Sequence, residues 1–275
     1  MKGIIRSLFI FLAVLSLSSC NSISKIEEMI GAKNIEFEYM KNTSNIDKII
    51  VENARDKKFT FVITDKNAIS DIYDMLSRGK IVSQKSDLKP DYIFTIFDIN
   101  DNQYKYNYIA GNFTSILGNF YDDNDKVFYI SDSLDKNIIN NFLILRKPPK
   151  DFNDLYYNCI IDIIKEYYKE NKDFMDSSMA IDLYNDSVYR RFIFSFDVYN
   201  FENNLNNLSF NCKVYDTEKP EASDIPLSIN TVGFDENTYE CKYTFTKDKN
   251  IEAFTLKAEY QNEKWNISIS KDENT

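Results

Sequence analysis

Residues 152–171 read FNDLYYNCIIDIIKEYYKEN, and this stretch decides how the second half of the chain is built. Its apolar side chains recur at the i, i+3 and i+4 spacing of one helical face, which predicts a long amphipathic helix. Five strands, separated by Asn, Asp and Pro clusters, are predicted after it: Tyr189 to Tyr199, Leu208 to Tyr215, Tyr239 to Thr246, Ala253 to Tyr260 and Lys264 to Ser270. One helix laid on a twisted antiparallel sheet is the economical arrangement of these elements.

The last of these strands carries the single tryptophan of the chain. Trp265 shares one face of the strand with Ile267 and Ile269, because alternate side chains of a strand point the same way. We expect that face, and the indole with it, to pack against the helix of residues 152–171.

The first half shows the same mixture of elements. A hairpin is predicted from Ile46 to Val51 and Lys58 to Thr64, followed by a helix from Asp65 to Ser77 with Asp65 as its N-cap. The further elements, in chain order, are strands from Tyr92 to Ile99, Gln103 to Ile109 and Lys126 to Ile130, and a last helix that begins at Ser131 or Asp132. Both halves therefore predict the α+β class.

A basic segment with two prolines separates the halves. Arg146-Lys147-Pro148-Pro149-Lys150 interrupts both periodicities, because proline cannot donate to a strand ladder and restricts the residue before it. We predict two domains, residues 35–147 and 150–275, each with a helix packed on a twisted antiparallel sheet. Ahead of them, residues 20–34 contain the capping-box pattern Ser24-Lys25-Ile26-Glu27 and are expected to form a short stalk helix or a loose tether.

The first twenty residues, MKGIIRSLFIFLAVLSLSSC, are typical of a secretion signal. Lys2 and Arg6 precede an apolar run from Leu8 to Leu17. This run has ten residues, whereas a helix needs about 20 to span the hydrocarbon layer of a bilayer. Residues 1–19 are therefore predicted to be a signal peptide.

Leu17-Ser18-Ser19-Cys20 resembles the lipobox of bacterial lipoproteins. The resemblance implies that Cys20 is the lipid attachment site, that it carries acyl chains such as palmitate, and that it becomes the first residue of the mature protein. Two chains anchor a protein durably, whereas a single chain gives only marginal binding. The implied location is the extracytoplasmic face of the cell membrane, with the membrane as a partner through the lipid anchor. The alternative is a soluble secreted protein that happens to place a cysteine here.

Composition excludes several classes of function. The chain has no histidine, so no mechanism built on imidazole is available. The formal charge is −10, which opposes the neutralisation of phosphates that supplies most nucleic-acid affinity, so no nucleic-acid partner is expected. Most of this charge lies in residues 149–275, which contain 14 basic and 24 acidic side chains.

Three cysteines remain beside Cys20, namely Cys159, Cys212 and Cys241. Each falls on the apolar side of its predicted helix or strand, as buried free thiols commonly do. We predict three core residues; the alternative is a disulfide between Cys212 and Cys241, which an extracytoplasmic location permits. Their spacing matches no zinc pattern, and no metal or cofactor is expected.

Two clusters of Asp and Asn raise the question of calcium. They are Asp122-Asp123-Asn124-Asp125 and the set Asp98, Asn100 and Asn102. Neither has the glycine at position six and the glutamate at position twelve of an EF-hand loop. Because Asp and Asn are ordinary turn residues, turns are predicted, with calcium binding as the alternative.

No catalytic residue is predicted. Ser133-Leu134-Asp135-Lys136 and Ser86-Asp87-Leu88-Lys89 match the S-x-x-K pattern of penicillin-binding enzymes, but the companion S-D-N and K-T-G elements are missing. With 43 acidic residues, carboxylate pairs are inevitable and none stands out. A non-enzymatic role is favoured, and enzyme activity stays open.

Tyr104, Tyr106 and Tyr108 form a stripe with the period of a strand, facing opposite to Lys105 and Asn107. Alternation of this kind predicts a core face. If the stripe were exposed, its rings would serve as a partner-binding platform for a glycan or for another protein.

Residues 46–143 are similar to the YhfM-like domain of lipoproteins, through Asp91-Tyr92-Ile93-Phe94-Thr95-Ile96 and Phe128-Tyr129-Ile130-Ser131. The second half resembles the cystatin-like and NTF2-like folds in the order of its elements, which close on Lys264-Trp265-Asn266-Ile267. Neither resemblance assigns a catalytic or binding residue.

These observations predict a membrane-anchored extracytoplasmic lipoprotein with a non-catalytic binding or scaffold role in the cell envelope. Its partner would be an unknown envelope protein or glycan. One alternative is an envelope glycan hydrolase that uses paired carboxylates on the concave sheet face of the second domain. The other is a transporter-associated solute-binding protein, which needs a ligand cleft between the domains. A filled sheet face favours binding over hydrolysis.

Overall fold

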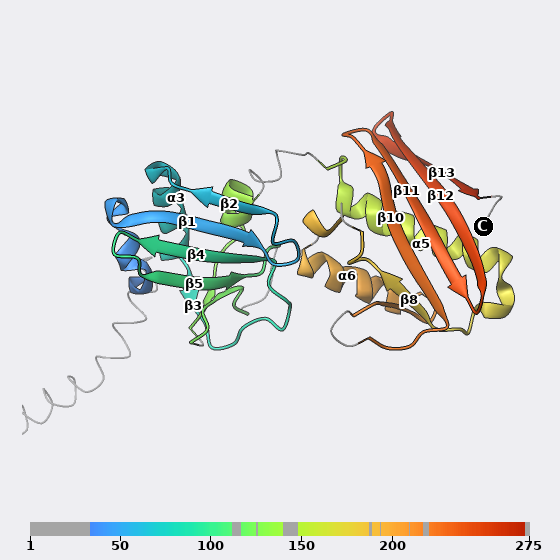
Figure 1. The fold of residues 1–275 in the computed structure, drawn as a ribbon, viewed down its shortest axis with the longest axis horizontal. Helices are drawn as coiled ribbons and strands as arrows, with labels where there is room; N and C mark the ends of the chain where they lie inside the picture. The colour runs from blue at the N-terminus through green and yellow to red at the C-terminus, as the bar shows by residue number, and fades with distance from the viewer. Residues whose placement is uncertain are drawn as a thin grey trace, which may run out of the picture.

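The computed structural model describes residues 34–111, 117–124, 126–139, 148–186, 189–192, 194–208, 210–216 and 220–272. The predicted signal peptide, Cys20 and nearly all of the predicted tether lie outside these residues. Two sheets with their own helices lie side by side along the long axis of the molecule (Figure 1). We call residues 34–139 the first unit and residues 148–272 the second unit. The arrangement confirms the α+β class.

The first unit is built on a seven-stranded sheet in the order β2-β1-β4-β5-β6-β7-β3. Its strands are β1 Ile46–Asn53, β2 Thr60–Ile63, β3 Lys80–Ile81, β4 Tyr92–Asp98, β5 Gln103–Tyr108, β6 Phe120–Tyr121 and β7 Val127–Tyr129. All pairings between these strands are antiparallel. The predicted hairpin and the three further strands of this half are thus confirmed, with shifts of a residue or two at their ends.

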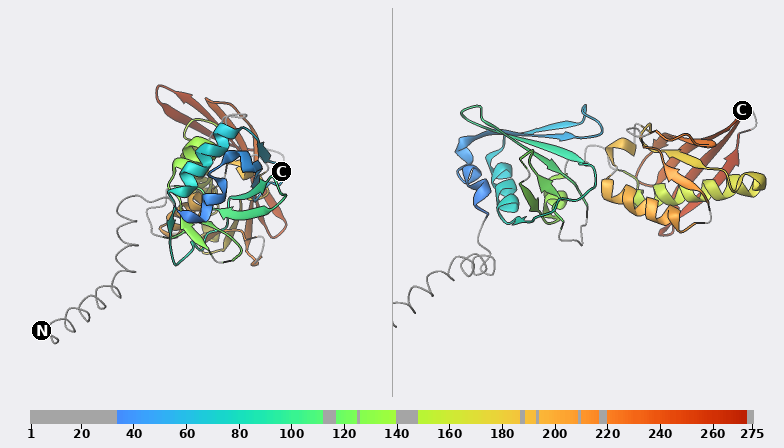
Figure 2. Two further views of the ribbon diagram at one scale, coloured as in Figure 1. Left: turned by 90° about the vertical axis from the view of Figure 1, so that its left-hand side faces the viewer. Right: turned by 90° about the horizontal axis from the view of Figure 1, so that it is seen from below.

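Short helices cover one face of this sheet (Figure 2). They are η1 Ile35–Met40, η2 Thr43–Asn45, α3 Lys66–Ser77 and η3 Asp135–Ile139. Asp65 caps α3 as predicted, because its side chain accepts a hydrogen bond from the amide of Ala68 at 2.9 Å. The core of the first unit lies beneath these helices and includes fully buried Ile49 of β1, Phe94 of β4 and Ile72 of α3.

The second unit is built on a six-stranded sheet in the order β13-β12-β11-β10-β8-β9. The strands are β8 Met179–Asp182, β9 Cys212–Val214, β10 Ile225–Phe234, β11 Thr238–Lys247, β12 Asn250–Gln261 and β13 Lys264–Lys271. The meander from β10 to β13 is antiparallel, but β8 runs parallel to both β10 and β9. The sheet is mainly antiparallel, as predicted, and its pairings are parallel at this edge.

Helix α5, Phe152–Glu170, lies across the inner face of the second sheet and confirms the helix predicted from its periodicity. Its buried face includes Cys159 and Ile163, which are both fully buried. Two short 3-10 helices, η5 Lys172–Phe174 and η6 Tyr189–Arg191, follow it. In the described part of the chain, no helix has both the length and the apolar character needed to cross a membrane.

The strand predicted from Tyr189 to Tyr199 is wrong, because this segment forms η6 and the start of helix α6, Ser195–Asn206. Val198, Phe201 and Leu205 of α6 are all buried at spacings of three and four residues. The segment is rich in Phe, Tyr and Val, which have high strand propensity, but packing on the core of the second unit decides its conformation. With β8 and β9, α6 forms a parallel β-α-β crossover at the end of the second unit that faces the first (Figures 1 and 2).

Candidate functional site

Arg55 lies in the turn after β1, at the end of the first unit that faces the second. Buried Asn53 shapes this turn, because its side-chain oxygen accepts hydrogen bonds from the amides of Arg55 and Asp56 at 2.8 and 2.9 Å. The Nη1 atom of Arg55 donates to Oδ1 of Asp91 at 2.6 Å. The two side chains are only 10% and 1% exposed, so this ion pair is shielded from water.

Asp91 immediately precedes β4 and accepts hydrogen bonds from both units. Its Oδ2 accepts from the amide of Ala110, two residues after the end of β5, at 2.8 Å. Its Oδ1 also accepts from the amide of Ser195, the first residue of α6, at 2.8 Å. Arg55 donates from Nη2 to Oγ of Ser195 as well. We call Arg55, Asp91 and Ser195 the clasp, because these three residues join the two units by hydrogen bonds.

The clasp places a carboxylate at the N-terminus of a helix, where the backbone dipoles and unpaired amides favour negative charge. Burial has the largest influence on Asp91 and raises its pKa, while Arg55 and the amides of Ser195 and Ala110 oppose that rise. Arg55, Ala110 and Ser195 donate to this carboxylate. The helix N-terminus in the clasp is therefore occupied by one of the protein's own side chains.

Further contacts join the units around the clasp. Arg191 pairs with Asp56 at 3.5 Å, and Lys89 pairs with Asp216 at 3.3 Å. Both of these pairs are more exposed than the clasp, so each contributes little to stability by itself.

Gly111 makes a close approach between the units possible. Its φ is +118°, and a Cβ at this position would lie 3.0 Å from Cβ of Phe196 in α6. The ring of the neighbouring Phe194 lies 6.4 Å from that of Tyr92. Any residue with a side chain would be strained here, because its backbone would have to adopt a positive φ and its Cβ would lie too close to Phe196.

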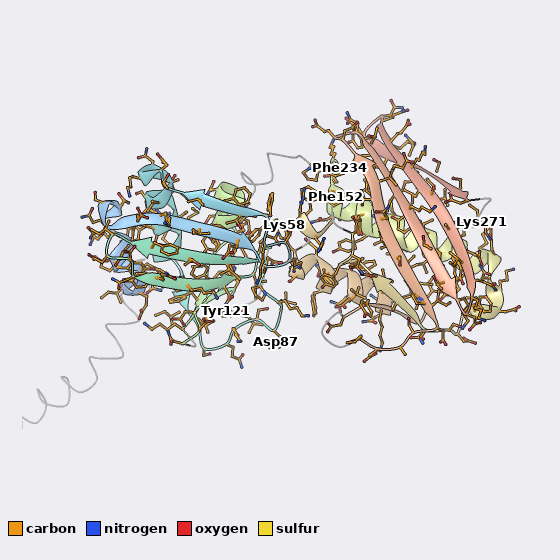
Figure 3. The ribbon with its side chains drawn as sticks, viewed as in Figure 1. Lys58, Asp87, Tyr121, Phe152, Phe234 and Lys271 are labelled. Carbon is orange, nitrogen blue, oxygen red and sulfur yellow. The ribbon has the colours of Figure 1, made fainter. Side chains whose placement is uncertain are left out.

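A cleft of about 200 Å³, the junction groove, lies beside the clasp and takes its walls from both units. The loop from Asp87 to Lys89 forms one wall, and Figure 3 shows Asp87 on the side of the first unit that faces the second. The other wall lies at the carboxyl ends of the parallel strands β8 and β9, a common place for ligand sites in α/β proteins. It is lined by Tyr184, Ser195, Val198, Tyr199, Glu202, Val214, Tyr215 and Asp216.

The groove combines aromatic rings with carboxylates. Tyr199 is 50% exposed, and Tyr184 and Tyr215 are half-buried. Partial burial and the charge of Asp216 raise the pKa of Glu202. Such a surface suits binding by stacking and hydrogen bonding.

Two other carboxyl groups near the junction, those of Asp135 and Asp197, have raised pKa values. Burial raises the pKa of Asp135 to about 6, although Gly111 and Tyr108 donate hydrogen bonds to it. Burial, followed by the charge of Asp91, raises the pKa of Asp197 in the first turn of α6 to about 7. Among the described residues, no group of three or more acidic or cysteine side chains could hold a metal ion.

The predicted tyrosine stripe lies mainly in the core of the first unit. Tyr108 is fully buried and donates to Oδ1 of Asp135 at 2.7 Å. Tyr106 is 7% exposed and stacks on Phe120, while half-buried Tyr104 stacks on Tyr39 at 4.0 Å between ring centroids. The structure therefore has the core face that alternation predicts, and the three rings form no open platform.

The other predicted positions are also explained by packing and turns. Cys159, Cys212 and Cys241 are buried free thiols, and the alternative disulfide between the last two is absent. Asp98 accepts from the amides of Asn100 and Asn102, so that cluster forms a turn.

The same holds at the second cluster and at the final strand. Asp122 accepts from the amides of Asn124 and Lys126, which is again turn geometry.

Trp265 is half-buried; its indole donates to the carbonyl of Lys150, just before α5, at 3.1 Å. Ile267 on the same strand is 38% exposed, so the face of β13 is covered less than we expected.

The sequence did not predict the clasp. One usable signal is the rarity of arginine, since the chain has 27 Lys and only 6 Arg. Arg55 and Arg191 both lie at the junction. The planar guanidinium of Arg55 donates from two different nitrogens to Asp91 and Ser195, a geometry that the ammonium group of a lysine does not reproduce. In the sequence, Asp91 stands out only as the first residue of the segment that resembles the YhfM-like domain, just before the predicted strand from Tyr92.

Comparison with known proteins supports one part of the sequence analysis. Residues 42–148 match the model of a family described as YhfM protein. This match confirms the resemblance of the first half to that family, and it contains Arg55 and Asp91 but not Ser195. No curated protein and no solved structure that was compared matches the chain. The resemblance of the second half to cystatin-like and NTF2-like folds stays a prediction.

Proposed function

We propose that the protein is a lipoprotein anchored at the extracytoplasmic face of the cell membrane, which acts by binding an envelope protein or glycan rather than by catalysis. The observation that carries the proposal is the segment that ends in Leu17-Ser18-Ser19-Cys20 after a short apolar run. Cys20 is its lipid attachment site.

The form of the second unit supports binding over the hydrolase alternative. Side chains of α5 and α6 fill the inner face of its sheet, where Tyr243, Cys241 and Leu227 are buried. Paired carboxylates would need an open concave face at this place. One accessible cleft lies at the junction, where rings and carboxylates from two units meet.

The same cleft is an observation that favours the solute-binding alternative, because it lies between the two units. Its volume of about 200 Å³ is below the ~300–1,000 Å³ that is typical of small-molecule pockets. A segment of a protein or a glycan that covers the groove from outside fits this size better than an enclosed solute does.

The anchor is tested by replacing Cys20. We expect Cys20→Ala to abolish the incorporation of labelled palmitate and to leave an unprocessed precursor or a released chain. Cys212→Ala is the matched control, and it should keep the label because this thiol is buried in the second unit. Mass spectrometry of the mature N-terminus checks both variants. An unmodified Cys20 within an intact natural chain would contradict the anchor.

The binding role is tested with a photo-crosslinking side chain at Tyr199, which is 50% exposed in the groove. The control places the same side chain at Val232, which is 59% exposed on the outer face of the second sheet. We expect a discrete adduct in intact cells from position 199 and none from position 232. Purified cell-wall polymer forms the glycan arm of the experiment. If neither arm gives an adduct that depends on position 199, the groove is not the binding site.

A further inference from the structure

We propose that Asp91 serves as a built-in carboxylate ligand for the N-terminus of α6, and that the clasp is the positioning device that holds the junction groove in shape. The parallel crossover β8-α6-β9 leaves a helix N-terminus beside the carboxyl ends of two strands. In α/β proteins this place commonly receives an external anion. Here the first unit inserts the carboxylate of Asp91, which accepts a hydrogen bond from the amide of Ser195 at 2.8 Å.

The burial of the clasp makes its geometry specific. Asp91 is fully buried, and its two oxygens accept from Arg55, Ala110 and Ser195. If the units separated or rotated, Arg55 and Asp91 would have to stay buried without the Ser195 donor or become hydrated. A buried ion pair contributes less to stability than its contacts suggest, but removing one partner leaves an uncompensated group. The clasp therefore acts mainly on the relative orientation of the units.

The clasp and the groove share parts of the chain. Ser195 belongs to both, and Lys89 of the groove wall is separated from Asp91 only by Pro90. A movement of Asp91 away from Ser195 would carry the loop from Asp87 to Lys89 away from Tyr184 and Tyr199. The groove thus has its described form only when the clasp is closed. This consequence for binding rests on the function proposed above, whereas the orientation of the units does not.

Ser195→Pro tests the clasp from the second unit. Proline removes the N–H group that donates a hydrogen bond to Asp91. It is well tolerated at the first position of a helix, and the extended backbone of Phe194 suits a following proline. Ser195→Ala is the matched control, because it keeps the amide. Asp91→Asn tests the clasp from the first unit, so that the result does not depend on one variant.

The readout is the distance between spin labels on the two units, measured in the full chain. The labels are attached at Val62→Cys in β2 and Ile251→Cys in β12, whose native side chains are 58% and 50% exposed. A Cys20→Ala background removes the thiol outside the described residues, and the remaining three thiols are buried. Circular dichroism confirms that each variant keeps its helices.

We expect one narrow distance distribution for the parent and for Ser195→Ala. Ser195→Pro and Asp91→Asn should give a distribution about twice as wide or a second peak, as expected when a hinge between units is released. Unchanged narrow distance distributions in both variants would overturn the proposal that the clasp fixes the relative orientation of the two units. Crosslinking at position 199 should fall in the same two variants. Absence of an adduct in the parent would overturn the binding role while leaving the distance result valid.

Discussion

Asp135 and Asp197 lie near the junction, and burial raises their pKa to about 6 and about 7. The folded chain therefore holds protons on these groups at pH values where the unfolded chain, with ordinary carboxyls, has lost them. Their favourable effect on folding is complete below the ordinary carboxyl pKa and is lost as the pH rises through 6 and 7. With respect to these two groups, the protein is more stable in mild acid than at pH 8.

This pH dependence gives a prediction for Asp197→Asn, because the amide of asparagine does not titrate. The free energy of unfolding of the parent should fall between pH 5 and pH 8, and the variant should show a smaller fall, most clearly above pH 6. Urea unfolding at several pH values measures both. Asp224→Asn is the control, because the pKa of exposed Asp224 is lowered, mainly by hydrogen bonds from Ser178, so it titrates below this range. A parent and an Asp197→Asn variant with parallel pH profiles would contradict the assignment.

At the scale of helices and strands, an element can be predicted from the sequence when the residues that determine it are close together in the chain. Helices α3 and α5 were predicted because their apolar periodicity is long and, for α3, because Asp65 marks the start. The hairpins of the first unit were predicted because their strands alternate and are joined by polar turns. All of these signals are local in sequence.

Elements fixed by distant contacts were missed. Strand β8 has four residues and is formed by parallel pairing with β10, which begins 43 residues after β8 ends. Strand β10 was not predicted either, although its hairpin with β11 is local in sequence, because Pro226 and Gly233 interrupt its apolar residues and weaken the strand pattern. The clasp joins Asp91 to Ser195 across 104 positions, so no window of sequence shows it.

Helix α6 gives a prediction at this scale, because sequence propensity favoured a strand there. Leu205 is 1% exposed and packs in the core of the second unit, whereas Asn204 beside it is exposed. We expect Leu205→Ala to lower the free energy of unfolding by about 2 to 4 kcal/mol, because it removes a buried side chain and leaves a cavity. Asn204→Ala should change it by no more than about 0.5 kcal/mol. Chemical denaturation compares the two, and equal effects would contradict the helical register.

At the scale of the whole molecule, each unit has its own core, and the cut predicted at Pro148-Pro149 falls between the two. We expect residues 33–147 and 150–275, expressed apart, each to unfold cooperatively. The first fragment should be less stable than the same unit in the full chain, because Arg55 and Asp91 lose the Ser195 donor and the cover of α6. Calorimetry of the fragments and of the full chain tests this. If neither fragment unfolds cooperatively, the boundary is wrong.

The order of the units along the chain also sets their height above a membrane. The described chain begins with η1, which lies at the end of the first unit that points away from the second (Figure 1). From Cys20 to Asn34 the chain takes 14 steps, which even fully extended reach about 50 Å. Under the proposed anchor, the first unit is the one held near the lipid surface, and the second unit with its negative charge projects outward. The junction groove then opens at the level of the surrounding envelope layer, within reach of partners that never touch the bilayer.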